Sequence, residues 1–244
     1  MSTITSLVPR SARRWLRRHG GPLGSVVAVD TGDPTFALTY DDGPEPGGTD
    51  AVLPVLAELG ATATFFVLMT RVRRHPELLR EGVDAGHEIA LHGVDHQPIS
   101  RMSYAQVKER TAAAKAELED AVGAPVRWFR PPYGSQSVTS FRAVRATGLT
   151  PVLWGATSWD SREATREERR ARAVTGAGRG TILLCHDGFA GTADGGRRDD
   201  APAVDRAEVA RTVLPAYREL GLEARSVGNL AASGRMVRGI WFGR

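Results

Sequence analysis

The chain has 244 residues, of which 41% are hydrophobic and 25% are charged, and its formal net charge at pH 7 is +4. This composition is ordinary for a globular protein and excludes a fibrous or wholly disordered chain. At this length one domain can bury a complete hydrophobic core, and barrels of this size commonly form a single domain. The single cysteine, Cys185, excludes an internal disulfide bond.

The positive charge is concentrated in an N-terminal arm, residues 1–34. Five arginines between positions 10 and 18 carry five positive charges, and without them the formal net charge falls from +4 to −1. We expect the arm to be solvated and partly disordered, with contact to an anionic membrane surface through Trp15 and Leu16 as the alternative. Because the rest of the chain is near neutral, we expect no nucleic-acid partner.

The N-terminal segment also bears on where the protein is located. No stretch of the sequence is long and apolar enough to span a membrane. The N-terminus also lacks the apolar core of a secretory signal, since SLVP is too short and GSVVAV follows the arginines. We therefore expect the chain as written to be cytoplasmic.

Short apolar runs alternate with helical patterns along the chain. The strands are expected at 35–40, 62–69, 87–91, 126–130, 150–154, 181–185 and 222–227. The helices are expected near 49–59, 76–85, 103–122, 136–147, 165–175 and 203–220. Capping-box spacing supports the helix starts at Ser103 and Thr165. This alternation predicts an α/β fold with parallel strands, either a barrel or an open doubly wound sheet.

Five polar clusters stand where predicted strands end. They are TYDDGP at 39–44, LHGVDH at 91–96, RPPYG at 130–134, WGATSWD at 154–160 and LLCHD at 183–187. Loops at the carboxyl ends of parallel strands meet on one face, which is where sites are built. The clusters therefore predict one shared site, bordered by the Gly-rich segment 188–202. Their side chains suffice to hold one divalent metal ion and to leave a base and an acid.

Two histidines in the second cluster are candidate metal ligands. His92 and His96 are four residues apart, so a short helical turn would direct both imidazoles at one ion. Capping or surface histidines are the alternative interpretation. Gly93 stands where the H-E-x-x-H metalloprotease pattern has its glutamate, so a base must come from another cluster.

The adjacent carboxylates Asp41 and Asp42 can supply that base. One can bind the metal ion while the other accepts a proton from the attacking group; the alternative is a plain Asp-Gly turn. A haloacid-dehalogenase-like phosphatase would need an aspartate where Gly43 stands. A phospho-receiver domain would need a lysine at a late strand end, but both lysines of the chain lie in the helix expected over 103–122.

The ordered clusters match a known family. Over residues 35–230 the chain resembles the polysaccharide deacetylases, also called the NodB-homology or carbohydrate esterase family 4 domain. TYDDGP, HGVDH, RPPYG, a partial motif around SWD and LLCHD correspond to its five motifs, and ATFFV and GHEIALH are also typical. The resemblance implies a single domain folded as a distorted (β/α)7-type barrel, followed by a C-terminal tail over 231–244.

The resemblance also implies how a metal ion and the acetyl group are bound. Asp42, His92 and His96 would hold one divalent ion, zinc in the first place, with cobalt, nickel or iron as alternatives. The backbone N–H of Tyr133 would line an oxyanion hole, and Leu184 would line the acetyl pocket. Three protein ligands leave an open position for water, whose pKa falls on the ion.

Four further residues would perform or support proton transfer. Asp41 would be the general base, and Arg130 would keep its carboxylate charged and oriented. His186 would be the general acid that protonates the departing amine. Asp160 would orient His186, although Ser161 stands where the family usually has tryptophan.

The implied activity is removal of N-acetyl groups from amino sugars of a glycan or glycoconjugate. Two enzymatic alternatives stay open, an esterase that removes O-acetyl groups from an acetylated polysaccharide and an amidase on a non-glycan amide. A third alternative is a catalytically weak glycan-binding module of the same fold.

Overall fold

The structure is a computed structural model, and it describes residues 24–242. The first 23 residues, which hold the arginines of the predicted arm, lie outside the described residues. Within the described range no helix is long and apolar enough to cross a bilayer.

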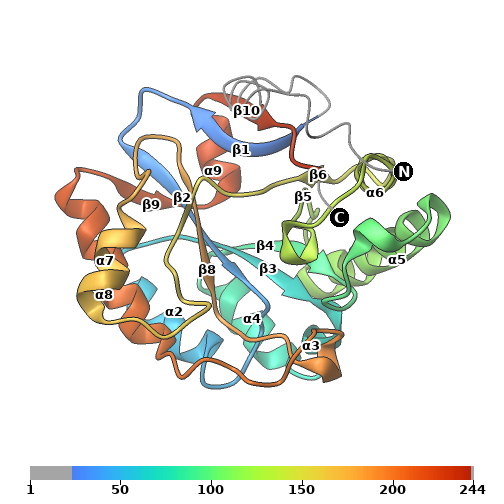
Figure 1. Ribbon diagram of the computed structural model, residues 1–244, viewed down its shortest axis with the longest axis horizontal. Helices are drawn as coiled ribbons and strands as arrows, with labels where there is room; N and C mark the ends of the chain where they lie inside the picture. The colour runs from blue at the N-terminus through green and yellow to red at the C-terminus, as the bar shows by residue number, and fades with distance from the viewer. Residues whose placement is uncertain (1–23, 243–244) are drawn as a thin grey trace, which may run out of the picture.

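A curled sheet of parallel strands forms the centre of the molecule (Figure 1). Along the sheet the order is β6 (Thr150–Pro151), β5 (Trp128–Phe129), β4 (Glu88–Gly93), β3 (Thr64–Leu68), β2 (Thr35–Asp41), β8 (Ile182–His186) and β7 (Ala156–Thr157). The short strand β9 (Glu223–Arg225) pairs with the beginning of β2. The seven strands from β6 to β7 form a half-barrel. The prediction of a distorted barrel is therefore confirmed, and the alternative prediction of an open doubly wound sheet is wrong.

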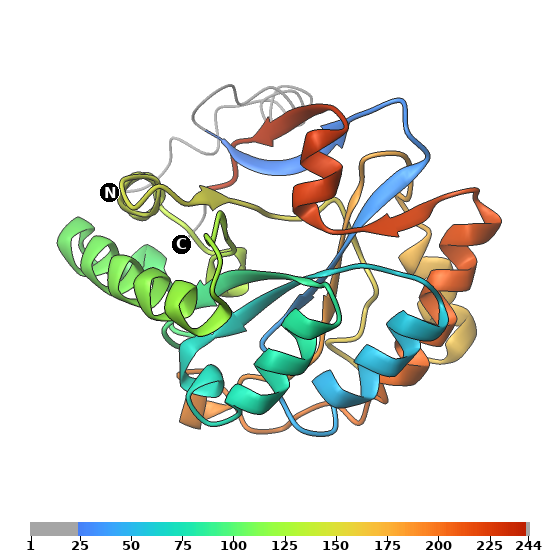
Figure 2. The same ribbon diagram turned by 180° about the vertical axis from the view of Figure 1, so that it is seen from behind.

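Helices cover the outside of the sheet in both views (Figures 1 and 2). They are α2 (Thr49–Glu58), α4 (Pro76–Asp84), α5 (Tyr104–Val122), α6 (Val138–Arg145), α7 (Arg166–Ala173) and α8 (Arg206–Glu219), with the short α3 (Met69–Val72) and α9 (Val227–Ala232). Each of the six predicted helices is present, with ends within three residues of the expected ones. Both predicted capping boxes form, at Ser103 and at Thr165.

The sheet has two buried faces, as parallel sheets usually do. Along β2 the side chains alternate, so that Phe36, Leu38 and Tyr40 pack under the helices. Ala37 belongs to a smaller apolar cluster on the concave face. Thr39 and Asp41 point to the same face as Ala37, because alternate residues of a strand share a face. The concave face therefore becomes polar toward the carboxyl end of the strand.

Two strands lie outside the expected domain range of 35–230. β1 (Ser25–Asp30) and β10 (Arg235–Gly239) pair with each other in antiparallel fashion. β1 also contacts the curled sheet at two places, because Val26 pairs with Val152 next to β6 and Ala28 pairs with Thr181 next to β8. The arm and tail boundaries drawn from the sequence therefore do not mark the limits of the packed structure. The apolar run SVVAV was the signal for β1, and β7 was likewise not predicted.

A substitution at Val26 tests whether β1 belongs to the folded domain. Val26 is fully buried, so Val26→Ala is expected to lower the free energy of unfolding by about 2 kcal/mol through lost apolar contact and a residual cavity. Urea unfolding measures it. Val138→Ala is the matched control, because Val138 is 55% exposed and its truncation should change stability by less than about 0.5 kcal/mol. Equal midpoints for the two variants would show that β1 is not part of the cooperative unit.

Candidate active site

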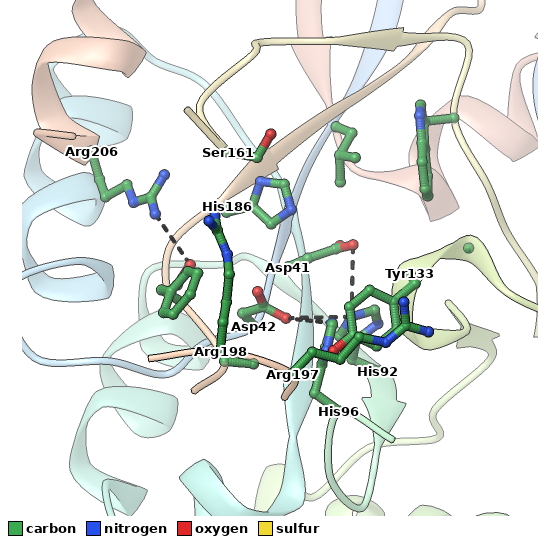
Figure 3. A pocket seen from close by; sticks show the side chains of 16 residues that line it. Asp41, Asp42, His92, His96, Tyr133, Ser161, His186, Arg197, Arg198 and Arg206 are labelled. Atoms are coloured by element: carbon green, nitrogen blue, oxygen red, sulfur yellow. Dashed lines mark hydrogen bonds and ion pairs between the residues drawn. The ribbon is translucent and has the colours of Figure 1, made fainter. Parts of the chain in front are cut away.

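A cavity of about 290 Å³ opens at the carboxyl ends of β2, β4 and β8 (Figure 3). Seven of the predicted site residues line it: Asp41, Asp42, His92, His96, Tyr133, Leu184 and His186. The other two, Arg130 and Asp160, are fully buried behind Asp41 and His186. The fold thus brings together residues from all five sequence clusters.

Three of these side chains form a group suited to one metal ion. Asp42 Oδ1 lies 3.4 Å from His92 Nε2 and 3.3 Å from His96 Nε2, and the three ligand atoms lie within 4.8 Å of one another. Tetrahedral bonds of about 2.1 Å would separate neighbouring ligand atoms by about 3.4 Å. Asp42 Oδ1 is buried without a hydrogen-bond partner among the described residues. A bound metal ion would give this oxygen a partner.

The protonation of the group also suits a cation. His92 Nδ1 lies 2.8 Å from the carbonyl oxygen of Arg130; since a carbonyl only accepts, Nδ1 carries the proton and Nε2 keeps its lone pair. Burial lowers the pKa of His96 to about 4, so its ring is neutral at pH 7. Burial raises the pKa of Asp42, but His92 and His96 outweigh it and hold the pKa well below its usual range.

The expected helical turn between the two histidines is wrong. His92 belongs to β4, and the chain then bends at Gly93, whose φ is 148°. A Cβ at this position would lie 2.9 Å from the carbonyl oxygen of Asp95. The backbone conformation at this position therefore favours glycine.

Asp41 and Asp42 point in different directions despite being adjacent. Asp42 has a φ of 80°, so the backbone turns between the two carboxylates. Asp41 Oδ1 accepts a hydrogen bond of 2.6 Å from Arg130 Nη1, while Asp41 Oδ2 lies 4.0 Å from His92 Nε2. One oxygen of Asp41 is thus held by the arginine, and the other lies near the metal group.

Sequence reasoning gave no role to Asp187, which holds this turn in place. Its carboxylate accepts from the N–H of Gly43 at 3.1 Å and from the hydroxyl of Thr49 at 2.6 Å. Burial is the main reason that the pKa of Asp187 rises to about 7. Its position directly after His186 in the fifth cluster was the available signal.

His186 and Asp160 form an ion pair beside Asp41, in which Asp160 is fully buried and the His186 side chain is partly exposed. His186 Nδ1 lies 2.8 Å from Asp160 Oδ1, and the backbone N–H of His186 donates to Asp160 Oδ2 at 2.6 Å. Burial lowers the pKa of His186, but Asp160 outweighs it and raises the pKa to about 9. The imidazole is therefore protonated at neutral pH.

Arg206 completes this pair and was not predicted. Its Nη1 donates to the carbonyl oxygen of Asp160 at 2.8 Å and lies 3.5 Å from Asp160 Oδ2. Burial raises the pKa of Asp160, but His186 and Arg206 outweigh it and keep the group ionised. Asp160 is thus positioned beside His186 even though Ser161 replaces the usual tryptophan.

Tyr133 and Leu184 lie on the wall of the cavity. Tyr133 follows two prolines, has a φ of 60° and packs its ring edge-on to His96 at 4.2 Å between centroids. Leu184 is 6% exposed and lines the cavity, whereas Cys185 packs into the core under the helices. Successive side chains of β8 thus face opposite sides of the sheet.

The segment 188–202 borders the cavity, as predicted. Phe189, Ala190, Arg197 and Arg198 line it. The buried carboxylate of Asp194 anchors the segment, because it accepts from Thr70, Arg71 and Arg74. The backbone carbonyl of Asp194 also accepts from the N–H of His96 at 2.7 Å, so the segment and the metal group support each other.

The family model for polysaccharide deacetylases matches residues 28–152. The chain belongs to this family. A chitooligosaccharide deacetylase of Bradyrhizobium sp. (strain ANU 289) is 34% identical over 93% of this chain and 100% of its own length. A peptidoglycan-N-acetylglucosamine deacetylase of Bacillus cereus is 35% identical over 71% of this chain and 82% of its own.

A solved structure extends the comparison. A family 4 acetyl xylan esterase from Clostridium thermocellum, in complex with a cobalt ion, has a TM-score of 0.69 and 30% identity, over 81% of this chain and 90% of its own. The resemblance predicted from the sequence is thus confirmed. As a member of the polysaccharide deacetylases, the protein is a hydrolase of carbon–nitrogen amide bonds other than peptide bonds.

Metal binding gives a direct test of the Asp-His-His group. The metal-stripped protein is expected to bind one equivalent of zinc, and Asp42→Asn should weaken binding more than about tenfold, because even second-shell changes cost that much. Calorimetric titration with zinc measures it. Asp84→Asn, which changes an exposed aspartate of α4 in the same way, should bind zinc like the unaltered protein. Unchanged affinity in the Asp42 variant would remove this group as the metal site.

Proposed function

We propose that the protein removes N-acetyl groups from amino sugars of a glycan or glycoconjugate with the help of one divalent metal ion. The observation that carries the proposal is one cavity lined by a group suited to a metal ion, by a second carboxylate and by an imidazole paired with a buried aspartate. The names of the relatives, which act on chitooligosaccharide and on peptidoglycan N-acetylglucosamine, support an acetylated amino sugar as the substrate.

Zinc is the metal that we propose, held by Asp42, His92 and His96. Two imidazoles and one carboxylate suit zinc, and also cobalt, nickel or iron. When bound, the ion polarises the amide carbonyl and lowers the pKa of water.

Asp41 is the proposed general base. Its Oδ2 faces the metal group, while Oδ1 is held by Arg130, so the carboxylate has one oxygen free to accept the proton of the attacking water. Arg130 is fully buried beside it and donates to Oδ1 at 2.6 Å, which fixes the direction of the carboxylate. The arginine thus orients the base and does not itself reach the cavity.

The acetyl group is proposed to lie between Leu184 and the loop of Tyr133. Leu184 offers an apolar surface for the methyl group. The backbone N–H of Tyr133 would donate to the developing oxyanion, an interaction whose loss typically costs about 3 kcal/mol. The two prolines before Tyr133 limit the motion of this N–H.

His186 is the proposed general acid. An amine leaves poorly unless it is protonated, and His186 carries a proton at neutral pH because Asp160 raises its pKa. His186 lies beside Asp41, its in-register partner on the neighbouring strand (Figure 3). Acid and base are therefore separate groups, each with its own buried partner.

The second candidate is an esterase that removes O-acetyl groups. The similarity to the acetyl xylan esterase of known structure favours it, and an ester would need the same base and oxyanion donor. Acetate release from chitotetraose and from acetylated xylan, each with defined added metals, separates the two. Sugar binding by the zinc-loaded protein without acetate release from either substrate would instead favour the glycan-binding alternative.

The role of the base predicts the effect of Asp41→Asn. The variant is expected to lower kcat for chitotetraose by about 10²- to 10⁴-fold, because the amide cannot accept the proton. Zinc stoichiometry should stay at one, since Asp41 is not in the metal group. Asp84→Asn serves as the control with normal kcat. A zinc-loaded Asp41→Asn protein with unchanged turnover would defeat the proposed mechanism.

The pKa of His186 predicts the basic side of the pH profile. As the pH rises through about 9, His186 loses its proton, so kcat/KM should fall there. Asp160→Asn removes the group that raises this pKa and should move the basic limb about 1–3 units lower. The ion pair also stabilises the fold below the ordinary pKa of 6.5, and this contribution is lost as the pH rises through 9. A basic limb that stays in place in the variant contradicts the assignment.

A further inference from the structure

Among the described residues that line the cavity, Arg197 is a positive charge without a carboxylate partner. Among the described residues, the other ionic groups that line the cavity have counter-charges or belong to the metal group. The pairs are Asp41 with Arg130, His186 and Arg206 with Asp160, and Arg198 with Asp200. Arg197 lines the same cavity, and no carboxylate of the described residues lies within 4.0 Å of it.

Arg197 is held in one place although it is exposed. Its guanidinium carbon lies 4.3 Å from the centroid of the Tyr133 ring, an attractive contact between a cation and an aromatic face. The segment that carries Arg197 is fixed at Asp194 and by the bond from the N–H of Gly196 to the carbonyl of Gly191 at 2.8 Å. The charge is therefore presented at a defined point of the rim.

That point lies close to the metal group. The ring of Tyr133 contacts both the guanidinium of Arg197 and, at 4.2 Å between centroids, the ring of His96 (Figure 3). A sugar whose acetamido group sits at Asp42, His92 and His96 would have neighbouring substituents within reach of Arg197. A neutral chito-oligosaccharide carries no group that would pair with this charge.

We propose that Arg197 binds an anionic substituent, a phosphate or a carboxylate, carried by the acetylated amino sugar or by its neighbour. The inference rests on the proposed function and narrows its substrate class. An arginine is always protonated, and its planar fork matches the two oxygens of a carboxylate or phosphate. The tyrosine contact involves no hydrogen bond of the guanidinium, and among the described residues no carboxylate competes for its N–H groups.

The experiment compares neutral and anionic sugars with the zinc-loaded full chain. Chitobiose, N-acetylglucosamine-1-phosphate and an N-acetylglucosamine–N-acetylmuramic acid disaccharide are given to the unaltered protein, Arg197→Gln, Arg198→Gln and Arg80→Gln. Arg80 is an exposed arginine of α4 that does not line the cavity, so its variant controls for net charge. Acetate release gives KM and kcat, and calorimetry gives the affinity for each sugar.

We expect Arg197→Gln to raise KM about tenfold for at least one anionic sugar and to leave chitobiose within about twofold. The phosphate and disaccharide arms show which anion is bound. Arg80→Gln should behave like the unaltered protein. Two results would overturn the inference. One is that Arg197→Gln raises KM equally for neutral and anionic sugars, and the other is that Arg198→Gln raises KM for the anionic sugars as much as Arg197→Gln does.

Failure of the proposed function is visible separately. If no sugar releases acetate, the deacetylase reaction is refuted, and calorimetry still decides the inference. Tighter binding of an anionic sugar than of chitobiose, lost in Arg197→Gln, supports it. Equal binding of all three sugars contradicts it.

Discussion

The site depends on one buried ion pair, between Arg130 and Asp41. Arg130 is fully buried at the end of β5, where an unpaired guanidinium would be prohibitively costly. Its N–H groups donate to Asp41, to Thr39 and to the carbonyl oxygens of Val152 and Leu153. Its guanidinium carbon lies 4.1 Å from the centroid of the Phe66 ring. The arginine thus joins β2 to the strand end after β6 and fixes the direction of Asp41.

The same residue also positions the metal group. Its backbone carbonyl accepts from His92 Nδ1, which fixes the tautomer in which Nε2 faces Asp42. A single residue therefore fixes both the carboxylate proposed as base and one proposed metal ligand. The two groups proposed to act on one water molecule are thus held by one residue, which limits their relative motion.

Support for the site comes from parts of the chain far apart in sequence. β1 contributes through Val26, whose carbonyl accepts from the N–H of Leu153, next to the carbonyl that binds Arg130. Asp187 holds the turn after Asp42, and Asp194 holds both the rim segment and the N–H of His96. None of these contacts follows from a local pattern, because each joins a residue to a partner more than 95 positions away.

The sequence by itself determined the six long helices, seven of the strands in their order and the five clusters at strand ends, because each depends on neighbours within a few residues. Local spacing failed at His92 and His96, where Gly93 bends a strand end and no helical turn forms. Only the tertiary structure decided the pairing of Asp160 with Arg206, the contact of β1 with the curled sheet and the placement of Arg197 against Tyr133. These depend on which distant side chains meet after the sheet has curled, because burial favours arrangements in which polar groups are paired.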